Sequence, residues 1–417
     1  MADPSRRDWM RVVGAGGAAL ALGCGDHGPS DLAAAILEPS SDALLVSVWA
    51  RRAREAVIEV RSDAGEARHA VPIAATGTAA LDLRGLPPGT AHEITVRAGD
   101  LRAGPYHART APRDDDPRPV RIAVGADVDP SPEFDTDLPA QIVAAAPELL
   151  VMLGDFPYAD NGPPAKDAPA FRDRHAETRT LGKVRTLLQA MPVRAIYDDH
   201  ELANDWDARI AAAEPARRAA ALAVWDEFFP LRDAAGEVRY RRWRWGAHAE
   251  CFLLDCRRFR SANPDPDGPA KTMLGAEQRA WLTAAIAAST ATFKLVLTSV
   301  PLDFGTGDDH WAAFRTERGA IFDALVGIPG VLFLSADQHW FAAHRHAYGI
   351  REFQVGPLAR GIREPPPPAP GVLFRHRQYN AGIVDIDGDR ITVAGLGPGG
   401  ARFYEETLTA AELTPRP

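Results

Sequence analysis

The chain has 417 residues, of which 46% are hydrophobic, and its formal net charge at pH 7 is −9. This length exceeds the roughly 100–200 residues of one typical domain, so at least two domains are expected. The negative charge argues against a nucleic acid or an anionic membrane as the main partner, because either requires a dominant basic surface.

Residues 1–30 have the composition of a targeting segment. Arg6 and Arg7 precede a Gly/Ala-rich apolar stretch at 12–22 that is too short to span a bilayer as a helix. The segment resembles a twin-arginine signal, and Cys24 ends a stretch that is similar to a lipoprotein cleavage box. We therefore expect export by the twin-arginine machinery to the periplasm or the extracellular space. A lipid anchor on Cys24 and an ordinary basic N-terminus both stay open.

Residues 31–113 show short alternating apolar runs separated by Gly, Pro and Asp turns, which is the pattern of a small β-sandwich. Strands are expected at 44–49, 56–60, 80–83 and 94–96. The segment 86–92 resembles the corner of fibronectin type III domains, with a packed His92 where tyrosine usually stands. The charged, proline-bounded segment 113–119 is typical of a linker.

From residue 120 to 417, apolar strand cores alternate with polar loops and with stretches of helical periodicity. Strands are expected at 120–124, 149–153, 193–197, 252–254, 295–298, 331–334 and 383–386, and helices at 167–190, 275–288 and 311–326. This alternation predicts an α/β sheet that is covered on both faces. Cys251 and Cys256 are expected to be buried and unbridged, since their odd separation on a strand points them to opposite faces.

Acidic and histidine residues follow four of these strands, in the segments 125–129, 154–158, 198–204 and 335–339. In an open α/β sheet such strand ends meet at a common edge, where ligands bind. Several carboxylates buried together would repel one another unless cations held them. Oxygen-rich ligand sets with few nitrogens favour calcium, manganese or ferric iron over a thiolate-type zinc site. The sequence therefore predicts a metal centre.

The order and the amino-acid sequences of these loops resemble those of the calcineurin-like metallophosphoesterases, and specifically those of the alkaline phosphatase D (PhoD-like) family. Gly-Asp-Phe-Pro-Tyr at 154–158 resembles the family's Gly-Asp-Tyr-Ile-Tyr, and Leu-Ser-Ala-Asp-Gln-His at 334–339 resembles Leu-Ser-Gly-Asp-Val-His. Tyr-Asp-Asp-His-Glu-Leu-Ala-Asn-Asp-Trp at 197–206 resembles Trp-Asp-Asp-His-Glu-Val-x-Asn-Asn-Trp. The resemblance implies an αββα metallophosphoesterase sandwich at 120–417, preceded by a fibronectin type III-like β-sandwich at 31–113.

The resemblance also implies roles for individual residues. As metal ligands it implies Asp155, which would bridge two ions, Tyr158, which would bind ferric iron through its phenolate, and Asp199, Asp337 and His339. His200 would stabilise or protonate the departing alkoxide, and Arg172 would hold a phosphate oxygen. The alternative for His200 is a loop-capping residue, and for Arg172 a surface salt-bridge partner.

Asp127 departs from the family, which often has cysteine at this position. A carboxylate is a harder ligand than a thiolate, so Asp127 is expected to ligate a hard ion. The expected cofactor is a dinuclear or larger centre of Fe³⁺ with Ca²⁺, with Mn²⁺ or Zn²⁺ as the alternatives. Such a centre would activate a hydroxide for attack on phosphate monoesters or diesters, on small molecules or lipids. The alternatives are a phospholipase D-like phosphodiesterase and a catalytically inactive binding protein.

Three further segments carry weaker signals. His344 and His346 share one face of a strand, which permits a second metal site but favours a satisfied structural pair. The acids of 308–311 are interpreted as helix N-caps that at most line a substrate cleft. The alternating arginines and aromatics of 239–245 predict an amphipathic strand in preference to a site for an anionic polymer.

Overall fold

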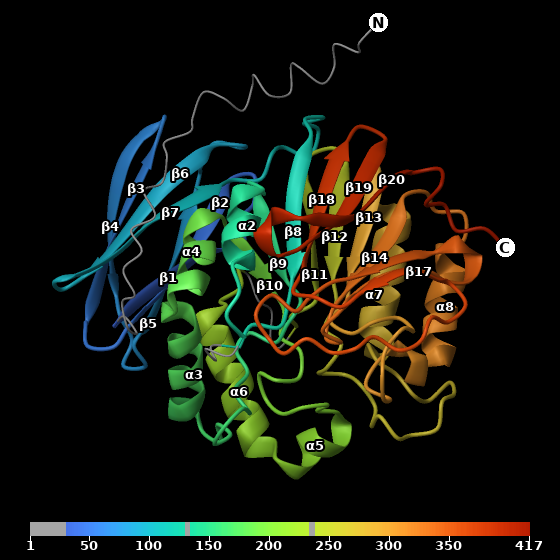
Figure 1. Cartoon of the computed structure of the whole chain (residues 1–417). Helices are drawn as coiled ribbons and strands as arrows, with labels where there is room; N and C mark the ends of the chain where they lie inside the picture. The colour runs from blue at the N-terminus through green and yellow to red at the C-terminus, as the bar shows by residue number, and fades with distance from the viewer. Residues whose placement is uncertain (1–30, 130–133, 233–237) are drawn as a thin grey trace, which may run out of the picture.

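The computed structural model of the protein describes residues 31–129, 134–232 and 238–417 (Figure 1). The expected export signal with Arg6 and Arg7, and the expected lipid anchor at Cys24, lie outside these residues. No helix within the described ranges has both the length and the apolar character needed to cross a membrane.

The N-terminal strands form a sandwich of two antiparallel sheets, drawn in blue to cyan in Figure 1. The strands are β1 (Leu32–Leu37), β2 (Ala43–Ala50), β3 (Glu55–Ser62), β4 (Gly65–Pro72), β5 (Thr78–Arg84), β6 (Ala91–Ala98) and β7 (Leu101–Arg109). One sheet has the order β4-β3-β6-β7, and the other contains β1, β2 and β5. Apolar side chains such as Ile36, Val46, Ile58 and Val96 fill the space between the sheets. The predicted β-sandwich is confirmed.

This sandwich shares a sheet with the rest of the chain. Strand β1 pairs in parallel with β10 (Val193–Ala195) through Leu37 and Val193. Directly after β1, the buried carboxylate of Glu38 accepts hydrogen bonds from the guanidinium groups of Arg194 and Arg241. The junction between the two predicted domains is therefore a continuous sheet fastened by buried ion pairs.

Two large sheets face each other, and the first of them continues into β1, β2 and β5 of the N-terminal sandwich. The first has the order β20-β19-β18-β8-β9-β10-β1-β2-β5, with β8 (Val120–Gly125), β9 (Leu149–Met152), β18 (Ala381–Asp387), β19 (Arg390–Leu396) and β20 (Arg402–Thr409). The second has the order β11-β12-β13-β14-β16-β15-β17, with β11 (Arg241–Trp245), β12 (Ala249–Leu253), β13 (Phe293–Leu297), β14 (Val331–Ser335), β15 (Phe341–Arg345), β16 (Arg351–Gln354) and β17 (Val372–His376). Fully buried side chains including Val124, Val151, Leu295 and Leu334 form the core between them.

Helices cover the outer face of each sheet. Against the first sheet lie α2 (Leu138–Ala144), α3 (Ala168–Thr180), α4 (Gly182–Ala190) and α6 (Pro215–Phe228), and against the second lie α7 (Gly275–Ala288) and α8 (Arg315–Leu325). Figure 1 shows these two groups on opposite sides, in green and in gold to orange, with the short α5 (Ala208–Ala213) at the bottom of the view. This four-layer arrangement confirms the αββα sandwich.

Several expected elements differ in detail. The predicted helix 167–190 is two helices, because Leu181 adopts an extended conformation with φ −60° and ψ 136°. The helix predicted at 311–326 is a 3-10 turn at Trp311–Ala313 followed by α8. Cys251 and Cys256 are buried and unbridged, as expected.

Candidate metal centre

The predicted ligand residues meet at one edge of the two sheets. Strands β8, β9 and β10 pair in parallel, so the loops that follow them emerge at the same end. Potential ligand atoms of three residue groups each lie within 4.8 Å of one another: Asp127, Asp155 and His339; Asp155, Asp199 and His200; and Asp198, Asp199 and Asp337. Asp155 and Asp199 each belong to two of these groups, which is the position that a bridging ligand requires.

The backbone of this site is held in an uncommon conformation. Asp127, Asp155, Asp337 and His339 have φ values of 62°, 56°, 77° and 62°. Residues other than glycine seldom adopt positive φ, and holding each one there costs on the order of 1 kcal/mol. Such strain concentrates at functional sites, where the surrounding structure enforces it.

Gly154, immediately before Asp155, allows its loop to approach Asp198 closely. Its φ is 114°, and a Cβ atom at this position would lie 2.4 Å from Cβ of Asp198. Glu201 then clamps the two ligand loops together, because its carboxylate accepts from the backbone N–H of Phe156 at 2.8 Å and of Asp198 at 2.9 Å. Glu201 is therefore a positioning residue of the histidine loop.

Several carboxylate oxygens of the site have no hydrogen-bond donor. These are both oxygens of Asp127, Oδ2 of Asp155 and Oδ1 of Asp199, in side chains that are 0–1% exposed. Burial, together with the charge of Asp198, raises the pKa of Asp127 to about 8, and burial with the charge of Asp199 raises the pKa of Asp155 well above its ordinary range. Buried carboxylates of this kind need cations or protons. The site therefore fits a group of metal ions.

His339 has the hydrogen bonding of a metal-ligating imidazole. Its Nδ1–H donates to the carbonyl oxygen of Gly361 at 2.6 Å, which leaves the Nε2 lone pair facing the site. Nε2 lies 3.1 Å from the hydroxyl of Tyr158 and 3.8 Å from Oδ1 of Asp127. Burial and the charge of Arg363 lower the pKa of His339 to about 3, so the ring is neutral.

His200 occupies the other side of Tyr158 and is a cation. Burial favours the neutral ring, but the charge of Asp199 and a hydrogen bond to Asp160 raise the pKa of His200 to about 9. The Nδ1–H donates to Oδ1 of Asp160 at 2.8 Å, and the imidazole packs against the Tyr158 ring at a centroid distance of 4.2 Å and an interplanar angle of 33°. Nε2 is thus available to a ligand in the site.

Sequence reasoning missed Asp160. It lies only two residues after Tyr158, in a stretch of turn-forming residues where an acid carries no distinguishing signal. The structure gives it a purpose, since its carboxylate orients His200 and also accepts from the backbone N–H of Asn204 at 2.7 Å.

Arg257 is the second group that the sequence did not reveal. Its guanidinium is 0% exposed and bonds the carboxylate of Asp198 at 2.6 and 2.8 Å and that of Asp309 at 2.8 and 2.6 Å. Asp198 is therefore neutralised by the protein itself. The interpretation of Asp309 as a helix cap was wrong, because its carboxylate also bonds Arg260 at 2.6 Å and Asn263 at 2.7 Å.

Arg172 is not brought into contact with the other site residues. Its guanidinium makes two hydrogen bonds of 2.6 and 2.7 Å to the carboxylate of Glu227 on α6. This bidentate pairing uses the donors that a phosphate would need. The geometry therefore favours the salt-bridge alternative for Arg172. Arg363 lies next to the centre, because its backbone N–H donates to the carbonyl oxygen of His339 at 3.3 Å, and its charge favours a lower pKa of Asp127 and His339.

Comparisons with known proteins identify the family that this chain resembles. A family model described as PhoD-like phosphatase matches residues 137–365, more than half of the chain. Alkaline phosphatase D of Bacillus subtilis (strain 168) is 27% identical over 201 residues, which cover 40% of this chain and 34% of that protein. The chain thus aligns with about one third of the length of this curated relative.

Solved structures show the same fold. The structure of PhoD superimposes with a TM-score of 0.81 at 17% identity and covers 92% of this chain and 90% of that one. Purple acid phosphatase PPD1 from yellow lupin seeds superimposes with a TM-score of 0.66 at 12% identity, covering 92% of this chain and 75% of that one. From the extent of the family match and the ordered loops at the strand ends, this chain belongs to the PhoD-like phosphatase family.

Proposed function

We propose that this protein hydrolyses phosphate esters at a centre of two or more metal ions. The observation that carries the proposal is the set of buried carboxylate oxygens without donors on Asp127, Asp155 and Asp199, next to a cationic His200. Such an arrangement is costly in a protein without cations and useful in one that binds a charged oxyanion through them. Membership of the PhoD-like family supports the same reaction class.

The donor set would divide between neighbouring ions. Asp127, Asp155 and His339 would hold one ion, and Asp155 with Asp199 would hold the next. Asp337 and Tyr158 would complete the set, with ferric iron on the phenolate and calcium among the carboxylates. When bound, the ions would lower the pKa of a water molecule and offset the charge that builds on the phosphoryl oxygens.

The chain's own residues would handle the leaving group. His200 carries a proton, and Asp160 fixes its ring through Nδ1, so Nε2–H can donate to the departing alkoxide. Arg363 replaces Arg172 in the proposal as the guanidinium that attracts the phosphate, because its charge reaches both Asp127 and His339.

Hydrolysis of matched chromogenic mono- and diesters by wild type and Asp155→Ala tests this proposal. Loss of a bridging carboxylate should lower kcat/KM by more than the roughly 10–100-fold typical of losing a residue that only supports a ligand. Asp173→Ala, on the exposed face of α3, is the matched control and should keep wild-type rates. Equal turnover by wild type and Asp155→Ala would refute the proposal. A strong diester preference would select the phospholipase D-like alternative.

Colour and metal content test the ferric assignment separately. A phenolate of Tyr158 on ferric iron should absorb visible light, and Tyr158→Phe should remove this band while iron is still detected by elemental analysis. A colourless wild-type protein without iron would overturn the ferric assignment and leave the hydrolase proposal standing.

A further inference from the structure

A second group of potential ligands lies on one β-hairpin. It is separate from the metal centre described above, which is called the strand-end centre below and contains Asp127, Asp155, Asp199, Asp337 and His339. Strands β15 and β16 pair antiparallel, and His344 stands directly opposite Glu352. His346 follows two residues after His344 on the same face, at the start of the hairpin turn. One nitrogen of each histidine and one oxygen of Glu352 lie within 4.8 Å of one another.

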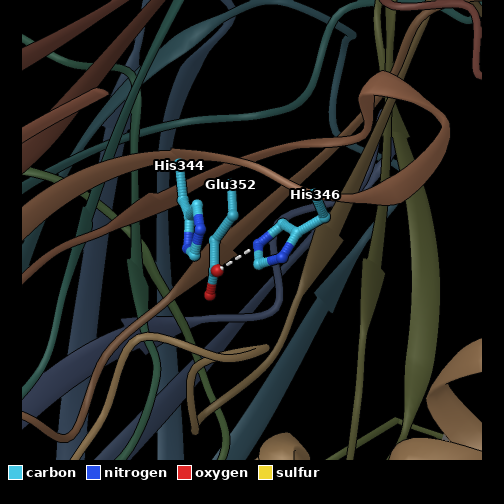
Figure 2. Close-up of side chains that lie close together, drawn as sticks. All are labelled: His344, His346 and Glu352. Atoms are coloured by element: carbon cyan, nitrogen blue, oxygen red, sulfur yellow. Dashed lines mark hydrogen bonds and ion pairs between the residues drawn. The ribbon is translucent and has the colours of Figure 1, made fainter. Parts of the chain in front are cut away.

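Figure 2 shows the carboxylate of Glu352 between the two imidazole rings. The ring centroids of His344 and His346 are 4.1 Å apart, and Nε2 of His346 donates to Oε2 of Glu352 at 2.7 Å. The side chain of His344 is buried, and its Nδ1 has no hydrogen-bond partner. A buried imidazole nitrogen without a partner is uncommon and requires an explanation.

The surroundings of His344 leave its Nδ1 as an electron-pair donor. The opposite nitrogen, Nε2, lies 3.4 Å from the carbonyl oxygen of Pro370, which selects the tautomer with the proton on Nε2. Gly371 gives the imidazole its space, because a Cβ atom there would lie 2.7 Å from Nε2 of His344.

Glu352 is fixed from the side opposite the histidines. Its Oε1 accepts from the backbone N–H of Leu302 at 2.8 Å and from the hydroxyl of Ser335 at 2.5 Å. Carboxylate ligands of metal ions are held by outside hydrogen bonds in this way.

We propose that His344, His346 and Glu352 bind one divalent transition-metal ion, with Zn²⁺ as the best match. Two imidazoles and one carboxylate are a common zinc donor set, and a water molecule can fill the fourth tetrahedral position. Metal–ligand distances of about 2.0–2.1 Å place tetrahedral ligand atoms about 3.3 Å apart. The 2.7 Å contact between His346 and Glu352 therefore has to open by roughly half an ångström when the ion takes the place of the proton between them, which passes to solvent.

The role of this ion is structural. Glu352 also bonds Ser335, two residues before Asp337, and the backbone of Leu302 in the loop that leads to Asp309. An ion on the hairpin therefore braces two segments that carry residues of the strand-end centre without contacting substrate.

Co²⁺ and Zn²⁺ titration of metal-free protein tests the proposal. His344→Phe removes the ligand and retains the ring that packs against Phe304. His92→Phe is the matched control, because His92 is also a buried histidine whose ring nitrogens lack partners, but no carboxylate accompanies it in a potential metal group among the described residues. Wild type and His92→Phe should bind one more equivalent of Zn²⁺, by elemental analysis, than His344→Phe.

The spectrum of bound Co²⁺ and the melting temperature give readouts that are independent of activity. The visible bands of four-coordinate Co²⁺ should be present in Asp155→Ala and absent from His344→Phe. Added Zn²⁺ should raise the melting temperature of wild type more than that of His344→Phe. Equal Zn²⁺ stoichiometry in wild type and His344→Phe overturns the proposal. His344→Gln, which also lacks the imidazole, serves the same comparison if the phenylalanine variant does not fold.

Discussion

The domain junction and the strand-end centre both bury carboxylates, but they differ in how the buried negative charge is compensated. At the junction, both oxygens of Glu38 accept from the guanidinium groups of Arg194 and Arg241. At the centre, both oxygens of Asp127 lack a donor. Glu38 and Asp127 are 6% and 0% exposed, so the difference lies in the partners and not in burial.

This contrast separates a structural charge from a functional one. The charge of Glu38 is balanced by arginines within the fold. Removing that charge leaves the buried guanidinium groups without their carboxylate partner. The charge of Asp127 is not balanced by the protein, so the folded chain gains from a cation that it does not itself supply. The same carboxylate-to-amide substitution should therefore change stability in opposite directions at the two positions.

The largest effect is expected at the junction. Glu38→Gln breaks a buried ion-pair cluster and should lower the free energy of unfolding by about 3–5 kcal/mol. Activity per folded molecule should be unchanged. The measurement is chemical denaturation of wild type and variant, with Glu66→Gln as a control because Glu66 is an exposed ion-pair partner of Arg61. A loss below about 1 kcal/mol would place the junction among ordinary surface pairs.

The same pair of proteins should show a defined pH dependence. Burial raises the pKa of Glu38, but the charges of Arg194 and Arg241 lower it by a larger amount. The folded-state pKa is therefore below the ordinary value of 4.5. The contribution of Glu38 is therefore complete above pH 4.5 and is lost as pH falls through the lowered folded-state pKa. The difference in unfolding free energy between wild type and Glu38→Gln should be constant from about pH 7 to 5 and shrink in more acidic solution.

A smaller effect, with the opposite sign for stability, is expected at the centre. Asp127→Asn should lower kcat/KM about 100-fold, because a neutral amide is a weaker ligand for a hard cation. In metal-free protein at alkaline pH, it should raise the melting temperature, because it removes a buried charge that has no partner. Activity assays and thermal unfolding after chelation measure the two outcomes. If Asp127→Asn is less stable than wild type in the metal-free state, the buried charge of Asp127 is compensated by the protein as that of Glu38 is.

The smallest effect concerns the two arginines assigned to phosphate. Arg363→Ala should raise KM about tenfold, equivalent to about 1.4 kcal/mol, with kcat less affected. Arg172→Ala should leave KM unchanged and instead lower the melting temperature, because it breaks the pair with Glu227. Steady-state kinetics of both variants with a monoester shows which of the two arginines binds the phosphate. An elevated KM in the Arg172 variant would restore the original assignment.

The sequence predicted the layers of the fold because they follow from local patterns. The apolar runs at 120–124 and 331–334 lie within strands β8 and β14, and the periodicity of 275–288 matches α7. The joining of the sandwich to the larger sheet was not predictable, since it depends on Leu37 meeting Val193 far along the chain. The break at Leu181 was also missed, because an isolated extended residue does not interrupt an amphipathic pattern.

The composition of the centre was predicted better than its supporting contacts. Asp127, Asp155, Asp199, Asp337 and His339 were expected together, because each follows a strand that ends at the common edge. Asp160 and Arg257 come from segments without such a signal, and only the folded arrangement pairs them with His200 and Asp198. The pairing of Arg172 with Glu227 was not predictable, because the sequence position of Arg172 does not reveal that Glu227 lies opposite it on α6.

The pairing of β1 with β10 also has a consequence for synthesis on the ribosome. Arg194 follows Glu38 by 156 residues, so at roughly 5–20 residues per second the nascent chain exposes Glu38 for about 8–30 seconds before its partner emerges. During that interval the edge of β1 is open to pairing with other strands. The parallel partner of β1 is therefore absent from the nascent chain until β10 of the same molecule has been synthesised.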